Sequence, residues 1–376
     1  MRISSLFTFL CFLLVGPASR AAVLSLENPA VGPGQIAIAA LSFSPQGQPI
    51  SGIQFDVEWD AALDIETATG NQIGASSKIL YTAALTDRSR RFLIVGLNAG
   101  QISTGELLRC FLSTSVGAAP GTAQIRLTNV VAASPQGDSV FVQATSVIIP
   151  IQSTASAAPL PSEAILNAAS LVSGPVSPGE IITILGVPGT SAASPLLLIN
   201  GTQATTLYWG PGQINAILPF GLSLADTATI DLQSQARSIG KVSVPVAAAA
   251  PAIFTLLGNG TGPGAILNQD YSVNSPANPA QGDSIIMIYG TGFGAVNPPA
   301  ADGQRATGPA ATTLPVTATI AGVPAQVIYA GAAPGLIAGV AQVNVRVPKG
   351  LPSSTAPIAL SIGGLTTPAG ITVAIQ

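Results

Sequence analysis

The stretch Ile53-Gln-Phe-Asp-Val-Glu-Trp-Asp60 alternates apolar and polar residues without a break. Because successive side chains of a β-strand point to opposite faces, this pattern predicts a strand with its four apolar residues on a core and its polar residues in water. The three acidic residues of the stretch would then share the wet face. Three carboxylates there could bind calcium or supply the acid–base pair of a glycosidase. The alternation alone already requires polar residues at those positions, so we interpret them as a solvated strand face.

The composition extends this prediction to an all-β fold. Charged residues make up 8% of the 376 residues, whereas Gly (40) and Pro (31) are abundant; a typical soluble domain has about 25% charged residues. Long amphipathic helices need charged residues on their wet face, so this composition favours short strands joined by Gly and Pro turns. Further strands are predicted at Gln35–Phe43, Arg91–Leu97, Leu107–Ser113, Ala123–Val131 and Ser139–Pro150.

The absence of histidine narrows the function. The chain contains no histidine, although histidine is the side chain used most often for acid–base catalysis and metal binding. This excludes the usual Ser-His-Asp and Cys-His arrangements and the histidine-based metal motifs. A net charge of −3 offers no basic surface for nucleic acid. We therefore predict that the protein is not an enzyme, and we assign no catalytic residue, cofactor, metal site or nucleic-acid partner.

The N-terminus has the order of a secretory signal peptide. Met1-Arg2 gives a positive start, Leu6–Val15 is almost entirely apolar, and small residues follow up to Ala22. About ten apolar residues are too few for a membrane-spanning helix, which needs roughly 20. We predict cleavage after Ala21, export, and a secreted or cell-surface location without a membrane span.

Cleavage would leave a single cysteine. The chain has 2 Cys, and Cys11 lies inside the apolar run that would be removed. Cys110 alone cannot form an internal disulfide or a cysteine-based zinc site. Its apolar neighbours predict a buried strand residue.

Changes in amino-acid composition divide the chain into five parts. A small, Pro-punctuated stretch separates a first segment with more charges from a later region rich in Gly, Pro and Val. The predicted parts are the signal peptide at 1–21, a first β-sandwich at 22–151, a linker at 152–161, and two repeats at 162–250 and 251–376.

The two repeats are predicted from three pairs of matching blocks. Residues 179–186 match 282–290, residues 201–208 match 322–329, and residues 213–221 match 342–350. The order and near-constant spacing of the blocks indicate two copies of a unit of about 100 residues, the size of an immunoglobulin-like sandwich. Asn215 and Asn344 are predicted to occupy equivalent positions in the two copies.

Residues 22–151 resemble the cohesin domain. Residues 51–60 show the cohesin order of glycine, an apolar residue, Phe, an apolar residue and an aromatic residue followed by Asp. Residues 105–111 and 121–130 are similar to later cohesin strands. The resemblance implies a nine-stranded jelly-roll sandwich, related in fold to family-three carbohydrate-binding modules, that recognises a protein partner such as a dockerin through one face.

Residues 159–376 resemble a C-terminal region of large secreted proteins of Acidobacteria of the Solibacter type. The matching phrases are Asn167-Ala-Ala-Ser170, Ala250-Pro-Ala-Ile-Phe254, Asn278-Pro-Ala-Gln-Gly-Asp283, Tyr289-Gly-Thr-Gly-Phe-Gly294 and Gln342-Val-Asn-Val-Arg-Val-Pro348. The phrase at 289–294 is also similar to IPT/TIG immunoglobulin-like domains. This resemblance implies two immunoglobulin-like β-sandwiches and adds no chemistry.

A few residues are candidates for contact with a partner. Arg88, Arg90 and Arg91 form the one notable charge cluster, beside a predicted strand, and are either a solvated hairpin tip or a patch for an acidic partner. Tyr81 is the only tyrosine of the first segment. Trp209, next to Tyr208, could stack on a sugar or pack in a core.

Two functions remain open from the sequence. The first is a non-catalytic adhesion or binding protein, in which the cohesin-like module recognises an extracellular protein and the repeats serve as spacer or attachment region. The alternative is an extracellular carbohydrate-binding protein associated with polysaccharide degradation. Several exposed coplanar rings on one sheet would favour the sugar, whereas a face with few rings and a polar rim would favour the protein.

Overall fold

The computed structural model describes residues 21–96, 98–115, 117–153, 160–188, 195–210, 212–234 and 237–376. The predicted signal peptide, apart from Ala21, and most of the predicted linker lie outside these ranges. Almost every described element is a β-strand, as predicted. No helix in these ranges is long and apolar enough to span a bilayer.

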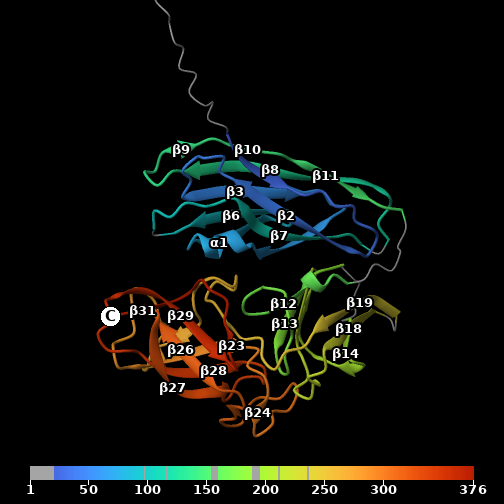
Figure 1. Cartoon of the computed structure of the whole chain (residues 1–376). Helices are drawn as coiled ribbons and strands as arrows, with labels where there is room; N and C mark the ends of the chain where they lie inside the picture. The colour runs from blue at the N-terminus through green and yellow to red at the C-terminus, as the bar shows by residue number, and fades with distance from the viewer. Residues whose placement is uncertain are drawn as a thin grey trace, which may run out of the picture.

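The N-terminal part is a sandwich of two sheets, which we call the docked sheet and the open sheet (Figure 1). The docked sheet has the order β10 (Val142–Ala144), β1 (Ala22–Leu26), β2 (Ile36–Ser44), β7 (Gly105–Ser113), β4 (Asp64–Thr69). The open sheet has the order β11 (Val147–Ile151), β8 (Gly121–Ala133), β3 (Gly52–Trp59), β6 (Ser89–Val95), β5 (Ile79–Thr86), with β9 (Ser139–Val140) paired to β8.

The core of this sandwich lies between the two sheets. It contains the four apolar residues of the stretch 53–60, and Phe55 stacks on Phe92 with ring centroids 5.5 Å apart. Cys110 of β7 is fully buried, as predicted, and burial raises the pKa of its thiol to about 12. The single strand predicted at 139–150 was wrong: the chain there forms β9, β10 and β11, because it crosses from one sheet to the other.

The first C-terminal unit holds two four-stranded sheets around a second core. One has the order β12 (Ile165–Asn167), β13 (Ile181–Val187), β17 (Gly212–Ile217), β16 (Thr205–Gly210). The other has the order β15 (Thr202–Gln203), β14 (Leu196–Ile199), β18 (Thr227–Ser234), β19 (Arg237–Pro245).

The second C-terminal unit wraps twelve strands around a third core. They are β20 (Ala252–Ile253), β21 (Gly262–Pro263), β22 (Ile266–Leu267), β23 (Ile285–Thr291), β24 (Val296–Asn297), β25 (Ala311–Thr312), β26 (Val316–Ile320), β27 (Val323–Ala332), β28 (Ala341–Arg346), β29 (Ser354–Ile362), β30 (Leu365–Thr366) and β31 (Ile371–Ile375).

Matching blocks of the two units pair in the same way. Asn215 of β17 lies opposite Tyr208, and Asn344 of β28 lies opposite Tyr329, each next to an irregularity in the ladder. In each unit a glutamine two residues earlier donates its amide N–H to the asparagine Oδ1 at 2.8 Å. The half-buried amide oxygens therefore have partners in both units.

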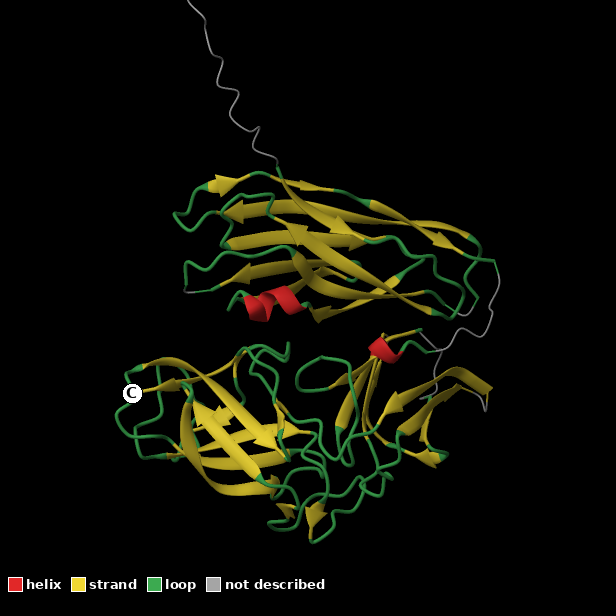
Figure 2. Ribbon diagram, viewed as in Figure 1, coloured by secondary structure: helices red, strands yellow, loops and turns green. Residues whose placement is uncertain are grey.

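The sandwich and the two units pack against one another (Figures 1 and 2). Both short helices, α1 (Asn71–Ala75) and η1 (Ser162–Ala164), lie between the sandwich and the units (Figure 2). Thr291 joins the two units, because its Oγ1 accepts from the Ile181 N–H and donates to the Gly339 carbonyl, both at 2.8 Å.

Candidate binding face

The outer face of the docked sheet is covered by the C-terminal units. Ala68 of β4 and Phe111 of β7 are buried in the same apolar cluster as the core of the first unit, and Ile36 and Ile38 of β2 pack against it. The approach is close: a Cβ added at Gly186 would lie 2.9 Å from Ile36 Cγ2. Over β2, β7 and β4 this face is therefore closed to a partner.

The second unit reaches the edge of the sandwich. Asn259 donates its side-chain N–H to the Leu80 carbonyl of β5, and its own carbonyl accepts from Thr69 Oγ1 of β4 at 2.7 Å. Asn259 thus holds the adjacent edges of both sheets. Apart from Ile79 at the start of β5, which lies beside Gly262 of the second unit, the outer face of the open sheet carries no such contact in the described residues, and it is the candidate binding face.

The centre of the open face is a closed ion pair. Asp56 of β3 is 1% exposed, so its prediction as a wet residue was wrong. Arg91 of β6 donates to both Asp56 oxygens at 2.7 and 2.8 Å, and Asn129 Nδ2 donates at 2.7 Å. The hydrogen bond from Arg91, together with that from Asn129, lowers the pKa of the Asp56 carboxyl despite its burial. Both side chains lie over the carboxylate and exclude water from it.

The other two carboxylates of the stretch are paired along the same face. Arg126 of β8 lies 3.2 Å from Asp60 Oδ1 and 3.7 Å from Glu58 Oε2. The Gln124 backbone N–H donates to Asp60 at 2.9 Å and is the main reason that the pKa of Asp60 is lowered. Thr128 Oγ1 donates to Glu58 at 2.9 Å. Because each carboxylate has its own donors, the three do not form a cluster arranged for one cation.

Exposed apolar residues lie at either end of these ion pairs. Val131 of β8 is 57% exposed and Ile148 of β11 is 58% exposed. Val131 lies opposite Gln54 of β3, and Gln54 lies opposite Leu93 of β6, which faces Tyr81 of β5. An apolar row interrupted by one amide therefore crosses four strands of the open face.

The structure separates the residues predicted to contact a partner. Tyr81 and Arg91 lie on the open face, and Arg88 is exposed in the turn that joins β5 to β6. Arg90 points to the opposite side of β6 and lies 3.3 Å from Glu66 of β4. Burial raises the pKa of the Glu66 carboxyl, and Arg90 opposes that rise. Trp209 is half-buried in β16 and packs against the core of the first C-terminal unit, so it is distant in the fold from the open face.

Sequence reasoning missed Val131, because a bulge changes its side. Ile125 and Leu127 of β8 are buried, and strict alternation places Val131 on the core as well. The ladder between β3 and β8 shifts register between Gln54 and Asp56, and Asn129 has a left-handed φ of 49°. The extra residue turns Val131 outward. Asparagine tolerates this conformation, but one Asn in a strand is too weak a signal to predict a bulge.

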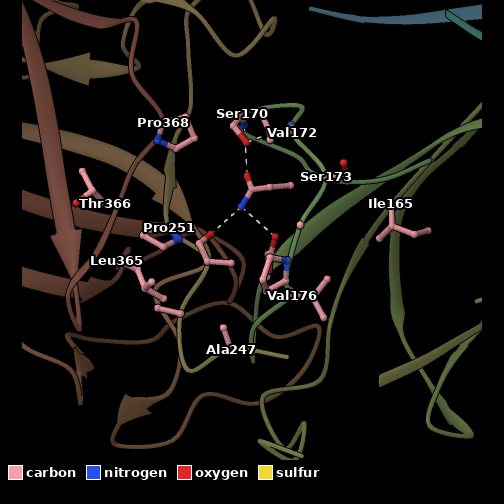
Figure 3. Close-up of a pocket in the computed structure, with 16 residues that line it drawn as sticks. Ile165, Ser170, Val172, Ser173, Val176, Ala247, Pro251, Leu365, Thr366 and Pro368 are labelled. Atoms are coloured by element: carbon pink, nitrogen blue, oxygen red, sulfur yellow. Dashed lines mark hydrogen bonds between the residues drawn. The ribbon is translucent and has the colours of Figure 1, made fainter. Parts of the chain in front are cut away.

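A second polar site lies between the C-terminal units (Figure 3). A cavity of about 260 Å³ is lined by residues of both units, including Val172, Pro251 and Leu365. Among the lining residues, Asn167 donates to Glu180 Oε1 and to the Ala250 carbonyl, each at 2.9 Å.

Glu180 is buried in this second site. The Ser177 backbone N–H donates to Glu180 Oε2 at 2.8 Å, and the Ser177 hydroxyl lies 3.3 Å away. Burial raises the pKa of the Glu180 carboxyl to about 8, although these donors and Asn167 oppose the rise. The arrangement ties the end of β12, the turn before β13 and the connection between the units to one carboxyl group.

Comparison with known proteins gives matches among solved structures. No family model and no curated protein matches the chain. Several of the solved structures that it resembles are cohesin modules. A cohesin from scaffoldin B of Acetivibrio cellulolyticus, solved with a Cel5 dockerin, is 16% identical and covers 35% of this chain and 100% of its own, with a TM-score of 0.33.

Two other cohesins give similar values. The non-cellulosomal cohesin of the archaeon Archaeoglobus fulgidus is 12% identical and covers 36% of this chain and 93% of its own, with a TM-score of 0.32. A cohesin module from a family 33 glycoside hydrolase of Clostridium perfringens is 15% identical and covers 36% and 97%, with a TM-score of 0.30.

Proposed function

We propose that this is a non-catalytic, secreted or cell-surface protein whose N-terminal sandwich binds a protein partner through the open face. One observation carries the proposal. The docked sheet packs its outer face on the first C-terminal unit, whereas the open sheet leaves Val131 and Ile148 exposed to solvent. Exposed apolar side chains around a polar, charge-neutralised centre favour a protein interface over plain solvent contact.

The aromatic residues favour a protein over a polysaccharide. Within β11, β8, β3, β6 and β5, Phe55, Trp59 and Phe92 are buried, and Tyr81 alone turns a ring to the outer face. Phe141 is 74% exposed, but it lies in the connection between β9 and β10 and not on these strands. A sugar platform uses several exposed rings, because each ring stacks on one sugar face. A single tyrosine beside aliphatic residues suits a protein surface better.

The sequence resemblance of residues 51–60 to cohesins supports the same proposal. That family recognises its partners through one face of the sandwich, and here one face remains open. We propose a dockerin-like domain or another extracellular surface protein as the partner. The division into 22–151, 162–250 and 251–376, the immunoglobulin-like character of the two later units, and their role as spacer or attachment region belong to this proposal.

Capture from the secreted fraction of the source tests protein against glycan. The chain of residues 22–376 is immobilised and exposed to secreted proteins and, separately, to insoluble polysaccharides. The proposal expects saturable retention of a protein and no saturable glycan binding. The carbohydrate alternative would be established instead by saturable glycan binding with two properties. Tyr81→Ala would abolish this binding, and changes at Arg88, Arg90 and Arg91 would leave it intact.

A further inference from the structure

The edge strand of the open sheet has little protection. Among the described strands β5 pairs only with β6, and every residue from Tyr81 to Thr86 is exposed. The strand contains no charged residue, glycine or proline. Sheet edges of soluble proteins usually carry charges, prolines or covering loops, because unpaired backbone groups there are a template for another strand. The edge of β5 therefore differs from an ordinary guarded edge.

The backbone groups that face this edge follow from one contact and, independently, from the register of the hairpin. The Leu80 carbonyl points away from β6, since it accepts from Asn259 of the second C-terminal unit. Period two then turns the N–H and C=O of Thr82 and Ala84 outward as well. The hairpin leads to the same assignment. Thr86 and Ser89 close a two-residue turn, so the backbone groups of Thr86 point toward β6. The extra residue between Ala84 and Thr86 shifts the alternation, so those of Ala84 point away from β6.

The open part of the edge is short and bounded. Asn259 occupies it at Leu80, and the irregularity after Ala84 ends the regular ladder. No hydrogen bond from outside β5 and β6 reaches Thr82 or Ala84 within the part of the chain that the structure describes. Four backbone groups on two residues are thus available to a new strand.

We propose that β5 pairs with β5 of a second copy of this chain, antiparallel about a two-fold axis at Ala83. In this register Thr82 lies opposite Ala84 of the second copy, and both turn their backbone groups to the partner. The two symmetric pairs form four hydrogen bonds. Centring the axis on Thr82 would need the Leu80 carbonyl, which Asn259 occupies, and centring it on Ala84 would place the irregular segment in the ladder.

The side chains match this register. Beyond the four hydrogen bonds, Tyr81 approaches Leu85 of the second copy, so the two exposed apolar side chains of the strand come near each other where the regular ladder ends. Ala83 lies opposite Ala83 of the second copy at the axis. These two residues form a pair without mutual hydrogen bonds, which is the kind of pair that brings side chains closest together. No charged residue lies within the paired stretch.

Pairing would join the two open sheets into one. The two open faces would then lie side by side on a continuous sheet, which presents two partner sites on one particle. The interface is small, so we expect a weak and concentration-dependent dimer. This inference does not depend on the proposed partner, because it uses the edge of the sheet and not its face.

Light scattering coupled to gel filtration tests the dimer on residues 22–376. Ala84→Pro removes one outward N–H without removing a bond of the β5–β6 ladder, and Ala84→Ser is its matched control. We expect the mass of the unmodified chain and of Ala84→Ser to rise with concentration, and that of Ala84→Pro to stay monomeric. A monomer at every concentration, or a dimer that Ala84→Pro leaves intact, overturns the proposal.

Cysteine cross-linking tests the register and serves if Ala84→Pro fails to fold. Ala83→Cys places two thiols opposite each other at the axis, within the Cα separation of about 4.4–6.8 Å that a disulfide needs. We expect it to give a covalent dimer under mild oxidation. Thr82→Cys alone faces Ala84 of the second copy and should stay unlinked. Equal linking by both variants, or none by Ala83→Cys, contradicts the register.

Discussion

Arg91 and Asn129 keep the charge of Asp56 inside the open sheet. Replacing Arg91 with alanine would leave this carboxylate with one side-chain donor. Removing one partner of a fully buried pair costs about 3–5 kcal/mol. Because the Arg91 side chain is itself 39% exposed, we expect Arg91→Ala to lower the free energy of unfolding by about 1–3 kcal/mol in urea denaturation at neutral pH.

The pH dependence of this loss is fixed by the lowered pKa of Asp56. A carboxyl with a lower pKa in the folded state stabilises the fold above its unfolded pKa of about 3.9, and the effect disappears as pH falls through the folded value. The difference between the unmodified chain and Arg91→Ala should therefore shrink under acid. Arg126→Ala is the control, since its ion pairs are exposed and worth about 0–1 kcal/mol. Equal losses for both variants would show that Asp56 is solvated.

Glu180 should have the opposite dependence. Its pKa of about 8 in the folded state lies above the unfolded value of about 4.3. The unfolded chain therefore loses this proton first, so the fold loses stability as pH rises from about 4.3 to about 8. Glu180→Gln cannot ionise, and we expect its free energy of unfolding to rise relative to that of the unmodified chain across this window. Parallel curves for the two proteins would mean that Glu180 is ionised in the fold.

At the scale of elements, the strands that depend on a local sequence pattern could be predicted, whereas features that depend on long-range strand pairing could not. The alternation at 53–60 predicted β3 and its buried face, because the two-residue period of a strand can be seen in the sequence of that strand alone. The split of 139–150 into three strands was missed, since it depends on which sheet each part joins. The bulge of β8 was missed for a similar reason: two residues of β8 lie opposite one residue of β3, and neither strand alone contains that information.

Gly186 offers a test of the contact between the docked sheet and the first C-terminal unit. It has a φ of 74°, and an added Cβ would lie 2.9 Å from Ile36 and 3.0 Å from Phe111. Gly201 has a φ of 81° and open space around it, so Gly201→Ala carries the same backbone strain of about 1–2 kcal/mol without a clash. We expect Gly186→Ala to cost about 1–3 kcal/mol more than Gly201→Ala in thermal or urea unfolding. Equal costs would mean that the two surfaces do not meet.

At the scale of the whole molecule, the sequence predicted an all-β chain and, through a family resemblance, a binding face. It could not predict which face stays open. That depends on Phe111 and Ile36, which read as ordinary strand residues but lie on the C-terminal unit. Arg88, Arg90 and Arg91 formed one cluster in the sequence, but neighbouring strand residues point to opposite sides, so Arg90 and Arg91 separate in the fold.

Export gives a prediction about the N-terminus of the secreted protein. If the first 21 residues form a cleaved signal peptide, secreted material should begin at Ala22 or within a residue or two of it. N-terminal sequencing of the secreted protein checks this. Exported protein that keeps Met1 would contradict it.

The central claim is that a protein partner binds on the outer face of the open sheet. Calorimetric titration of the captured partner into residues 22–376 measures this binding directly. The test variant is Val131→Asp on the open face. The matched control is Val323→Asp, which alters an exposed valine of β27. Val131→Asp would bury a charge at the interface, so we expect it to weaken binding at least about tenfold, equivalent to about 1.4 kcal/mol. Val323→Asp should keep the original affinity. Unchanged binding by Val131→Asp, or an equal loss in both variants, would contradict the account.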